Sequence, residues 1–106
     1  MRRELRFKPI ADEQLTKLEN TPALEGVLKQ VRKILGYLET NLEANSLHIH
    51  PHKALSIRYN QKINESYVQQ DTPGAYRVFW YYGKDELDKK RKPIPIITVV
   101  AITPHP

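Results

Sequence analysis

The sequence predicts an α+β fold in which two helices pack on one face of a mainly antiparallel sheet. Three observations predict this fold: a helical apolar repeat early in the chain, three strand-like segments in the second half, and turn residues between them. The 106 residues fit a single domain, residues 1–106, because a chain of this length holds one core. The expected order is strand, helix, helix, strand, strand, strand.

The first elements are short. Residues 4–9 alternate apolar and charged side chains, and Pro9 then ends the strand. Residues 11–19 carry two acids in the first turn, where the helix dipole favours them, and two leucines three positions apart.

The longest predicted element is a helix over residues 22–43, where apolar side chains recur every three or four positions. Thr21 can cap this helix, and Pro22 fits its first position because a missing N–H costs nothing there. Gly36 lies within the repeat. We expect it to mark a close contact, because glycine otherwise destabilises a helix by about 1 kcal/mol.

Three later segments have the residue pattern of strands: 63–70, 75–82 and 96–103. The last is almost entirely apolar, which is typical of a strand buried on both faces. The connections are expected to be an irregular or partly extended segment, a turn and a charged loop, at 46–58, 71–74 and 83–95. The sheet face opposite the helices needs another cover or is the working surface.

Composition excludes several classes of protein. The absence of cysteine excludes disulfides, thiolate metal sites and a cysteine nucleophile. No apolar run approaches the ~20 residues of a membrane span, and the charged start lacks a secretory signal, so we expect a cytoplasmic protein without a membrane partner. No phosphate-binding glycine loop, nucleophile elbow or HExxH motif is present. The net charge of +5 permits a nucleic-acid or acidic-protein partner without requiring one.

Three histidines alternate in the sequence. On an extended segment His48, His50 and His52 would point the same way and could bind zinc. No acidic residue lies nearby in sequence to complete such a site, and Pro51 interrupts the alternation. We therefore expect no metal site and no cofactor, and interpret the histidines as loop residues or as a phosphate-contacting patch.

The strand at 75–82 places Arg77, Phe79 and Tyr81 on one face. An arginine in an apolar strand either pairs with an acid such as Glu65 or projects onto an open face. On an open face these residues would form an RNA site, with a guanidinium for phosphate and rings for bases. Residues 84–92 include a four-residue basic run that could contact phosphates or could be a solvated hairpin tip.

The segment Gly74-Ala75-Tyr76-Arg77-Val78-Phe79-Trp80, the apolar strand 97–102 and the order of elements resemble the RelE/ParE superfamily of bacterial toxins. The resemblance covers nearly the whole chain. It implies a toxin of a toxin–antitoxin pair, neutralised by an antitoxin protein. In the RelE-like branch the toxin is a metal-independent endoribonuclease that cuts mRNA on the ribosome, whereas ParE-like members poison DNA gyrase.

The resemblance also implies roles for individual residues. Arg77 matches the strand arginine that contacts the scissile phosphate, and His105 falls near the position of a C-terminal His or basic residue, a candidate acid or base. The nuclease lysines of the second strand are missing, because those positions hold Val68 and Gln70 in the preferred register. The C-terminal catalytic tyrosine is missing too.

Six other residues are candidates for binding RNA: His50, His52, Lys53, Arg58, Phe79 and Tyr81. The first four of these, or the tyrosines, could substitute for the missing catalytic groups. Losing two cations and an acid could lower the cleavage rate by several orders of magnitude, because each such group is typically worth ~10²-fold or more. The alternative is therefore a RelE/ParE-fold protein that binds gyrase, another protein or RNA without cutting anything.

Overall fold

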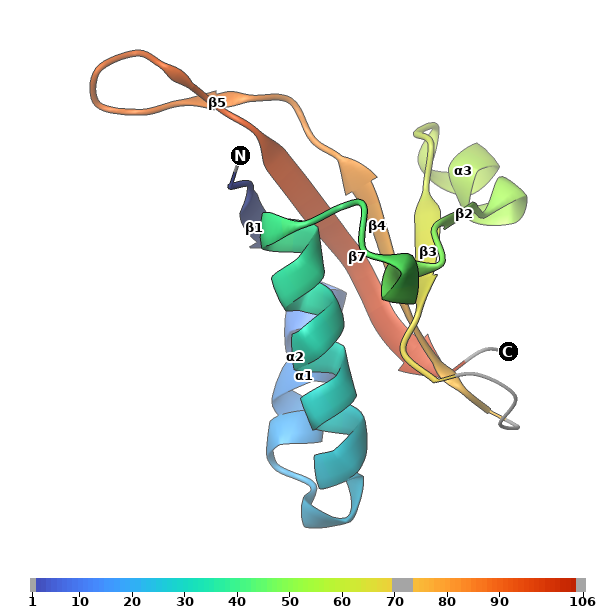
Figure 1. The fold of residues 1–106 in the computed structure, drawn as a ribbon. Coiled ribbons are helices and arrows are strands. Elements are labelled where there is room, and N and C mark those ends of the chain that lie inside the picture. Colours follow the sequence, from blue (N-terminus) through green and yellow to red (C-terminus); the bar gives the residue numbers. More distant parts are fainter. Residues whose placement is uncertain (1, 70–73, 105–106) are drawn as a thin grey trace.

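The computed structural model describes residues 2–69 and 74–104 (Figure 1). Its three α-helices and two short 3-10 helices are α1 Pro9–Glu19, η1 Pro22–Leu24, α2 Glu25–Thr40, η2 Asn45–Leu47 and α3 Lys53–Tyr59, counted over these residues. The strands of the same residues are β1 Glu4–Phe7, β2 His50–Pro51, β3 Asn64–Tyr67, β4 Tyr76–Tyr82, β5 Glu86–Leu87, β6 Pro93–Ile94 and β7 Ile96–Pro104.

Five strands form one mixed sheet in the order β1-β7-β4-β3-β2. β1 runs parallel to β7, and the other neighbours are antiparallel. β7 lies between β1 and β4. Its isoleucines and valines are buried on both faces, as its composition predicted. A bulge shifts the pairing of β4 with β7 between Phe79 and Trp80 and leaves Val100 as the extra residue.

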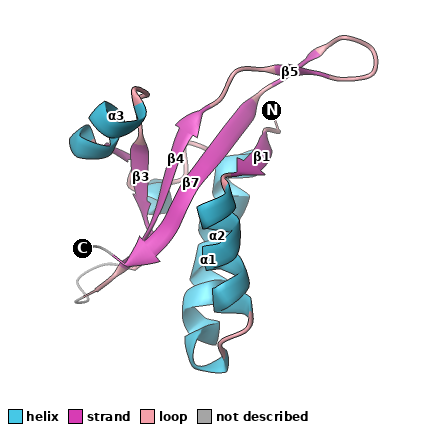
Figure 2. Cartoon of the chain, turned by 180° about the vertical axis from the view of Figure 1, so that it is seen from behind, coloured by secondary structure: helices cyan, strands magenta, loops and turns pink. Residues whose placement is uncertain are grey.

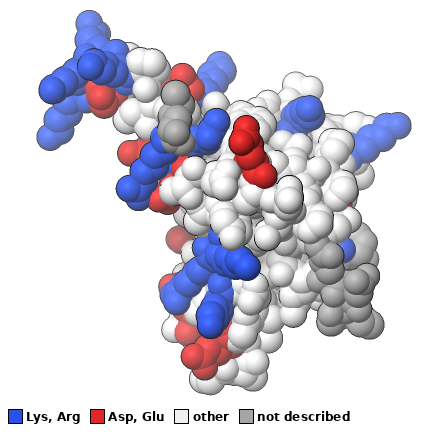
Figure 3. Space-filling view, in the orientation of Figure 1, with Lys and Arg blue, Asp and Glu red and all other residues white. Residues whose placement is uncertain are grey.

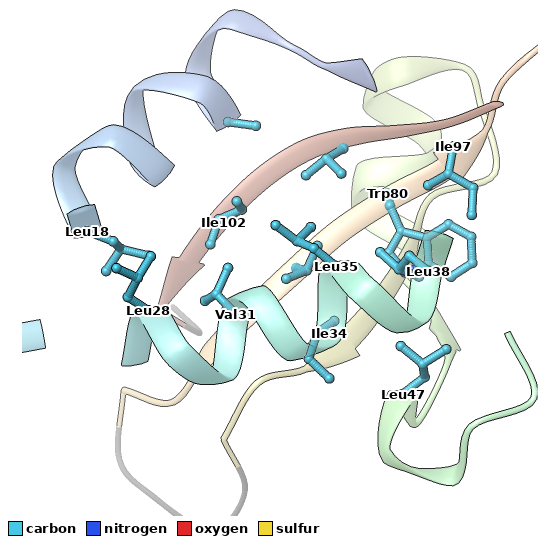
Figure 4. Packing of buried hydrophobic residues seen from close by; sticks show 13 residues of the cluster. Leu18, Leu28, Val31, Ile34, Leu35, Leu38, Leu47, Trp80, Ile97 and Ile102 are labelled. Atoms are coloured by element: carbon cyan, nitrogen blue, oxygen red, sulfur yellow. The ribbon is translucent and has the colours of Figure 1, made fainter. Parts of the chain in front are cut away.

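The helices α1 and α2 cover one face of the sheet and enclose the main core, as predicted (Figures 1 and 2). Five buried side chains of α2 lie on its sheet-facing side: Leu28, Val31, Ile34, Leu35 and Leu38. They pack against residues of β4 and β7, among them Trp80, Ile97 and Ile102 (Figure 4). Burying each such side chain stabilises the fold by roughly 1.5–3 kcal/mol, so the repeat that predicted the helix also builds the core.

The opposite face is covered in part by α3, a helix that the sequence reading missed. Leu55 of α3 packs against Ile63, Phe79 and Val100, which form a second, smaller core. The helix begins where the His52 ring accepts the backbone N–H of Leu55 and ends at a left-handed Asn60. Seven residues are too few for a clear apolar period, so the sequence pattern does not predict this helix.

The predicted loop at 83–95 is a projecting arm with its own two-stranded ladder, β5 and β6. It extends beyond the sheet at the upper left of Figure 1. The carboxylate of Asp88 accepts the backbone N–H groups of Lys90 and Lys92, and Arg91 adopts a left-handed φ of 60°. Asp88 therefore fixes a tight turn at the tip.

Several predicted boundaries need correction. Pro9 begins α1 instead of ending the first strand, because proline suits the first turn of a helix. The helix predicted at 22–43 is a 3-10 turn followed by α2, which ends at Thr40. Gly36 marks no close contact, since a Cβ added there meets nothing within 4 Å. The predicted turn at 71–74 lies outside the described residues except for Gly74.

Candidate functional site

The candidate site lies on the sheet face opposite α1 and α2. Alternation along β4 places Arg77, Phe79 and Tyr81 on this face, as predicted. α3 covers the middle of it, over Phe79. The face is thus divided into a region around Arg77 and a region around Tyr81, about 13 Å apart along β4 at the usual rise of a strand.

Arg77 is held by three groups of the neighbouring strand and the segment after it. Its Nε lies 3.8 Å from Oε2 of Glu65, and its Nη1 donates a hydrogen bond of 3.2 Å to the backbone oxygen of Gln69. Its Cζ lies 3.9 Å from the ring centroid of Tyr67, a cation–π contact. Of the two arrangements that the sequence allowed for Arg77, the structure shows the ion pair with Glu65.

The pair of Arg77 and Glu65 is largely removed from water but incompletely hydrogen bonded. The two side chains are 13% and 14% exposed. Nε of Arg77 and Oε2 of Glu65 are buried, and no described residue gives either atom a hydrogen-bond partner. Buried charged groups favour a full set of partners, so this ion pair is incompletely compensated by its hydrogen bonds.

Two histidines extend this cluster toward the sheet edge. His50 is directly opposite Glu65 in the pairing of β2 with β3, and its ring centroid lies 5.1 Å from that of Tyr67. His48, held in a left-handed conformation, stacks on the same ring at 6.0 Å. We define the phosphate cluster as Arg77, Glu65, Tyr67, His50 and His48.

The remaining predicted site residues lie elsewhere. The Nδ1 atom of His52 caps α3, and its ring meets Phe79 edge-on at 5.5 Å. Lys53 and Arg58 are exposed on α3, Phe79 is buried beneath that helix, and Tyr81 lies in the second region of the face. His105 and Gln70 lie outside the described residues. The structure therefore brings Arg77 together with His50 and places Lys53, Arg58 and Tyr81 elsewhere on the protein.

The sequence pattern indicated Glu65 only as a partner for Arg77 and did not single out Tyr67 from the other tyrosines. A carboxylate, a guanidinium and an imidazole at one place can accept a proton, bind a phosphate and donate a proton, respectively. The signal that could have revealed the group was the alternation of Glu65 and Tyr67 along a strand that pairs with β4.

Over residues 2–69 and 74–104, no three His, Asp or Glu side chains are grouped so that they could hold a metal ion. No helix within the same residues has the length and apolar content to cross a membrane.

No protein-family model matches this chain, and a search of curated proteins gives no match either. Any function assigned to it rests on the residues and their geometry.

Proposed function

We propose that this protein is a RelE/ParE-like toxin that acts as an endoribonuclease on mRNA in the ribosome. The observation that carries the proposal is the phosphate cluster, in which Arg77, Glu65 and His50 meet on the sheet face opposite the two long helices. The element order and the segment Gly74-Ala75-Tyr76-Arg77, which leads into β4, support it.

The residues of the cluster fit the chemistry of RNA cleavage through the 2′-OH. That reaction needs a base for the hydroxyl proton, a cation for the charge that develops on phosphorus oxygens, and an acid for the leaving oxygen. Glu65 offers a carboxylate as the base, and Arg77 offers a guanidinium for the phosphate. His50, or His105 from the sequence, supplies a candidate acid. This set would take the place of the lysines that the resemblance leads one to expect at Val68 and Gln70.

A second candidate function is binding without cleavage. The observation that favours it is the low exposure of Arg77 and Glu65, which are paired with each other. If the pair only stabilises the sheet, the surface around it would bind gyrase, another protein or RNA. Both candidates share an antitoxin partner, which we propose to be an acidic protein, complementary to the net charge of +5.

The deciding experiment is primer extension on a reporter mRNA in a purified translation system, with and without the protein. Endonuclease activity predicts discrete cuts that require ribosomes. Arg77→Lys, Glu65→Gln, His50→Gln and His105→Gln keep most of the volume of each side chain while changing its chemistry. Each change in a residue that takes part should lower the cleavage rate by ~10²-fold or more.

The matched control is Lys17→Ala with Lys29→Ala, which removes two exposed cations from α1 and α2. It should leave cleavage unchanged. Absence of cuts with folded wild-type protein would reject the nuclease and favour the binding protein, to be followed by gyrase inhibition assays. Cuts that survive both Glu65→Gln and Arg77→Lys would reject the phosphate cluster as the site.

A further inference from the structure

A groove of about 580 Å³ opens on the second region of the sheet face, between the end of α3, the strand β1 and the base of the arm. Its floor is a row of three side chains from neighbouring strands: Arg6 of β1, Thr98 of β7 and Tyr81 of β4. Tyr59, the last residue of α3, forms one wall and is 43% exposed. Two phenol rings thus line one groove.

The cations at this groove differ in whether they are paired with a carboxylate. Arg6 hydrogen bonds to both carboxylate oxygens of Glu86, at 2.7 and 3.2 Å, and also to Glu4. These bonds raise the pKa of Arg6 further, so it serves as a fixed link between β1 and the arm. Lys8 and Lys84 are exposed at the rim, and no described carboxylate lies within ion-pair distance of them. Their charges remain available to a ligand.

The arm continues this positive surface away from the groove. Its tip carries four consecutive cations, Lys89 to Lys92, and every residue from Lys84 to Pro93 is exposed. Two of the three acidic side chains of the arm already have partners within the protein. Glu86 pairs with Arg6 of β1, and Asp88 accepts the backbone N–H groups of the turn. Figure 3 shows the resulting concentration of Lys and Arg at the end of the arm, at the upper left.

We propose that the groove and the arm form a binding track for single-stranded RNA, separate from the phosphate cluster. Tyr59 and Tyr81 would stack bases, while Lys8, Lys84 and the tip cations would contact phosphates. A positively charged groove with aromatic side chains is the usual design for single-stranded nucleic acids. The choice of RNA over DNA rests on the proposed function. The track lies on the same sheet face as Arg77, so one strand could reach both.

Two features favour a single strand over a duplex or a protein partner. Rings inside a groove can stack only on bases that are unpaired and unstacked. The turn at the tip, residues 88–92, contains only charged side chains, so it lacks the apolar anchors that dominate protein–protein affinity. Phosphate contacts need cations alone.

The test is fluorescence anisotropy of the full chain with a labelled single-stranded 2′-O-methyl RNA, which cannot be cleaved through its 2′-OH. Binding is therefore measured independently of any nuclease activity. Tyr59→Ala should weaken binding by ~10-fold, because stacking of one base is worth ~1–3 kcal/mol. Tyr59→Phe should bind like the wild type, and Tyr59→Leu should bind like Tyr59→Ala. Tyr59 is exposed, so thermal unfolding should show all three variants folded.

The lysines are tested by the salt dependence of the same binding. Lys8→Ala with Lys84→Ala should reduce the slope of log K against log salt by about 1.4, or about 0.7 for each lost phosphate contact. Lys17→Ala with Lys29→Ala removes the same charge from the helical side and should leave the slope unchanged.

Three results would overturn the track. A duplex of the same length that binds as tightly as the single strand would show general attraction to polyanions. Equal slopes for the two lysine pairs would show that the position of the charge is irrelevant. An unchanged RNA affinity in Tyr59→Ala would show that Tyr59 does not stack on a base. If the protein cuts mRNA in the primer-extension assay but gives any of these three results, the proposed function stands and the track is rejected. If it binds single-stranded RNA as expected but cuts no mRNA, the track stands and the nuclease is rejected.

Discussion

Trp80 donates its indole N–H to the hydroxyl of Ser66 across 3.0 Å, and both side chains are fully buried. Trp80 lies on β4 and packs against α2, while Ser66 lies on the neighbouring strand β3. A buried indole N–H needs a partner, so this hydrogen bond lets the largest core side chain occupy the middle of the sheet. A polar residue inside the core is thus explained by the tryptophan beside it.

Ser66→Ala should destabilise the protein by about 1–3 kcal/mol, because the indole N–H would remain buried without a partner. Ser46→Ala, at an exposed position in the short helix η2, should change stability by less than about 0.5 kcal/mol. Urea unfolding of both variants measures the difference. Equal stability of the two variants would contradict the assigned role of Ser66.

Gly36→Ala should stabilise the protein by about 1 kcal/mol. Gly36 is exposed inside α2, and an added Cβ meets nothing within 4 Å, so alanine gains helix propensity without a clash. Gly74→Ala should instead cost about 1–2 kcal/mol, because Gly74 has a φ of 68° that L residues adopt poorly. Thermal unfolding should move in opposite directions for the two variants. A loss of stability in Gly36→Ala would mean that the added methyl group clashes with a neighbouring group, contrary to the open space around Gly36.

Arg77→Met should destabilise the protein by about 3 kcal/mol, because it leaves the carboxylate of Glu65 buried without its cation. Adding Glu65→Gln removes that charge, so the double variant should be more stable than Arg77→Met alone by at least about 1 kcal/mol. Denaturant unfolding of the two singles and the double forms the cycle. Strictly additive effects would contradict a direct interaction between the two side chains.

Glu86→Gln should loosen the arm while leaving the rest of the fold intact. The two hydrogen bonds from Arg6 to Glu86 are exposed and link residues 80 positions apart, so their contribution to global stability is small. Hydrogen exchange should become faster at the amides of the β5–β6 ladder and stay unchanged in α2. Asp85→Asn, next to it but without such a bond in the described residues, is the control. Equal exchange in both variants would contradict the link.

Less of the candidate site than of the fold could be predicted from the sequence. The pattern of β4 placed Arg77, Phe79 and Tyr81 on one face correctly, because alternation in a strand is a local property. Their separation into two regions was not foreseen, since it depends on α3 lying over Phe79. The sequence pattern does not single out Tyr59 or Lys8 either. They lie far from Tyr81 in sequence, and only packing brings them to one groove.

Local patterns in the sequence were enough to predict α1, α2, the apolar strand β7 and the helical cover of one sheet face, because periods of 3.6 and 2 decide which side chains must be buried together. Three features became visible only in the folded chain: the parallel pairing of β1 with β7, the choice of Glu65 as the partner of Arg77, and the groove at the base of the arm. Each depends on contacts between segments distant in the chain, and local periodicity carries no information about strand register or neighbours.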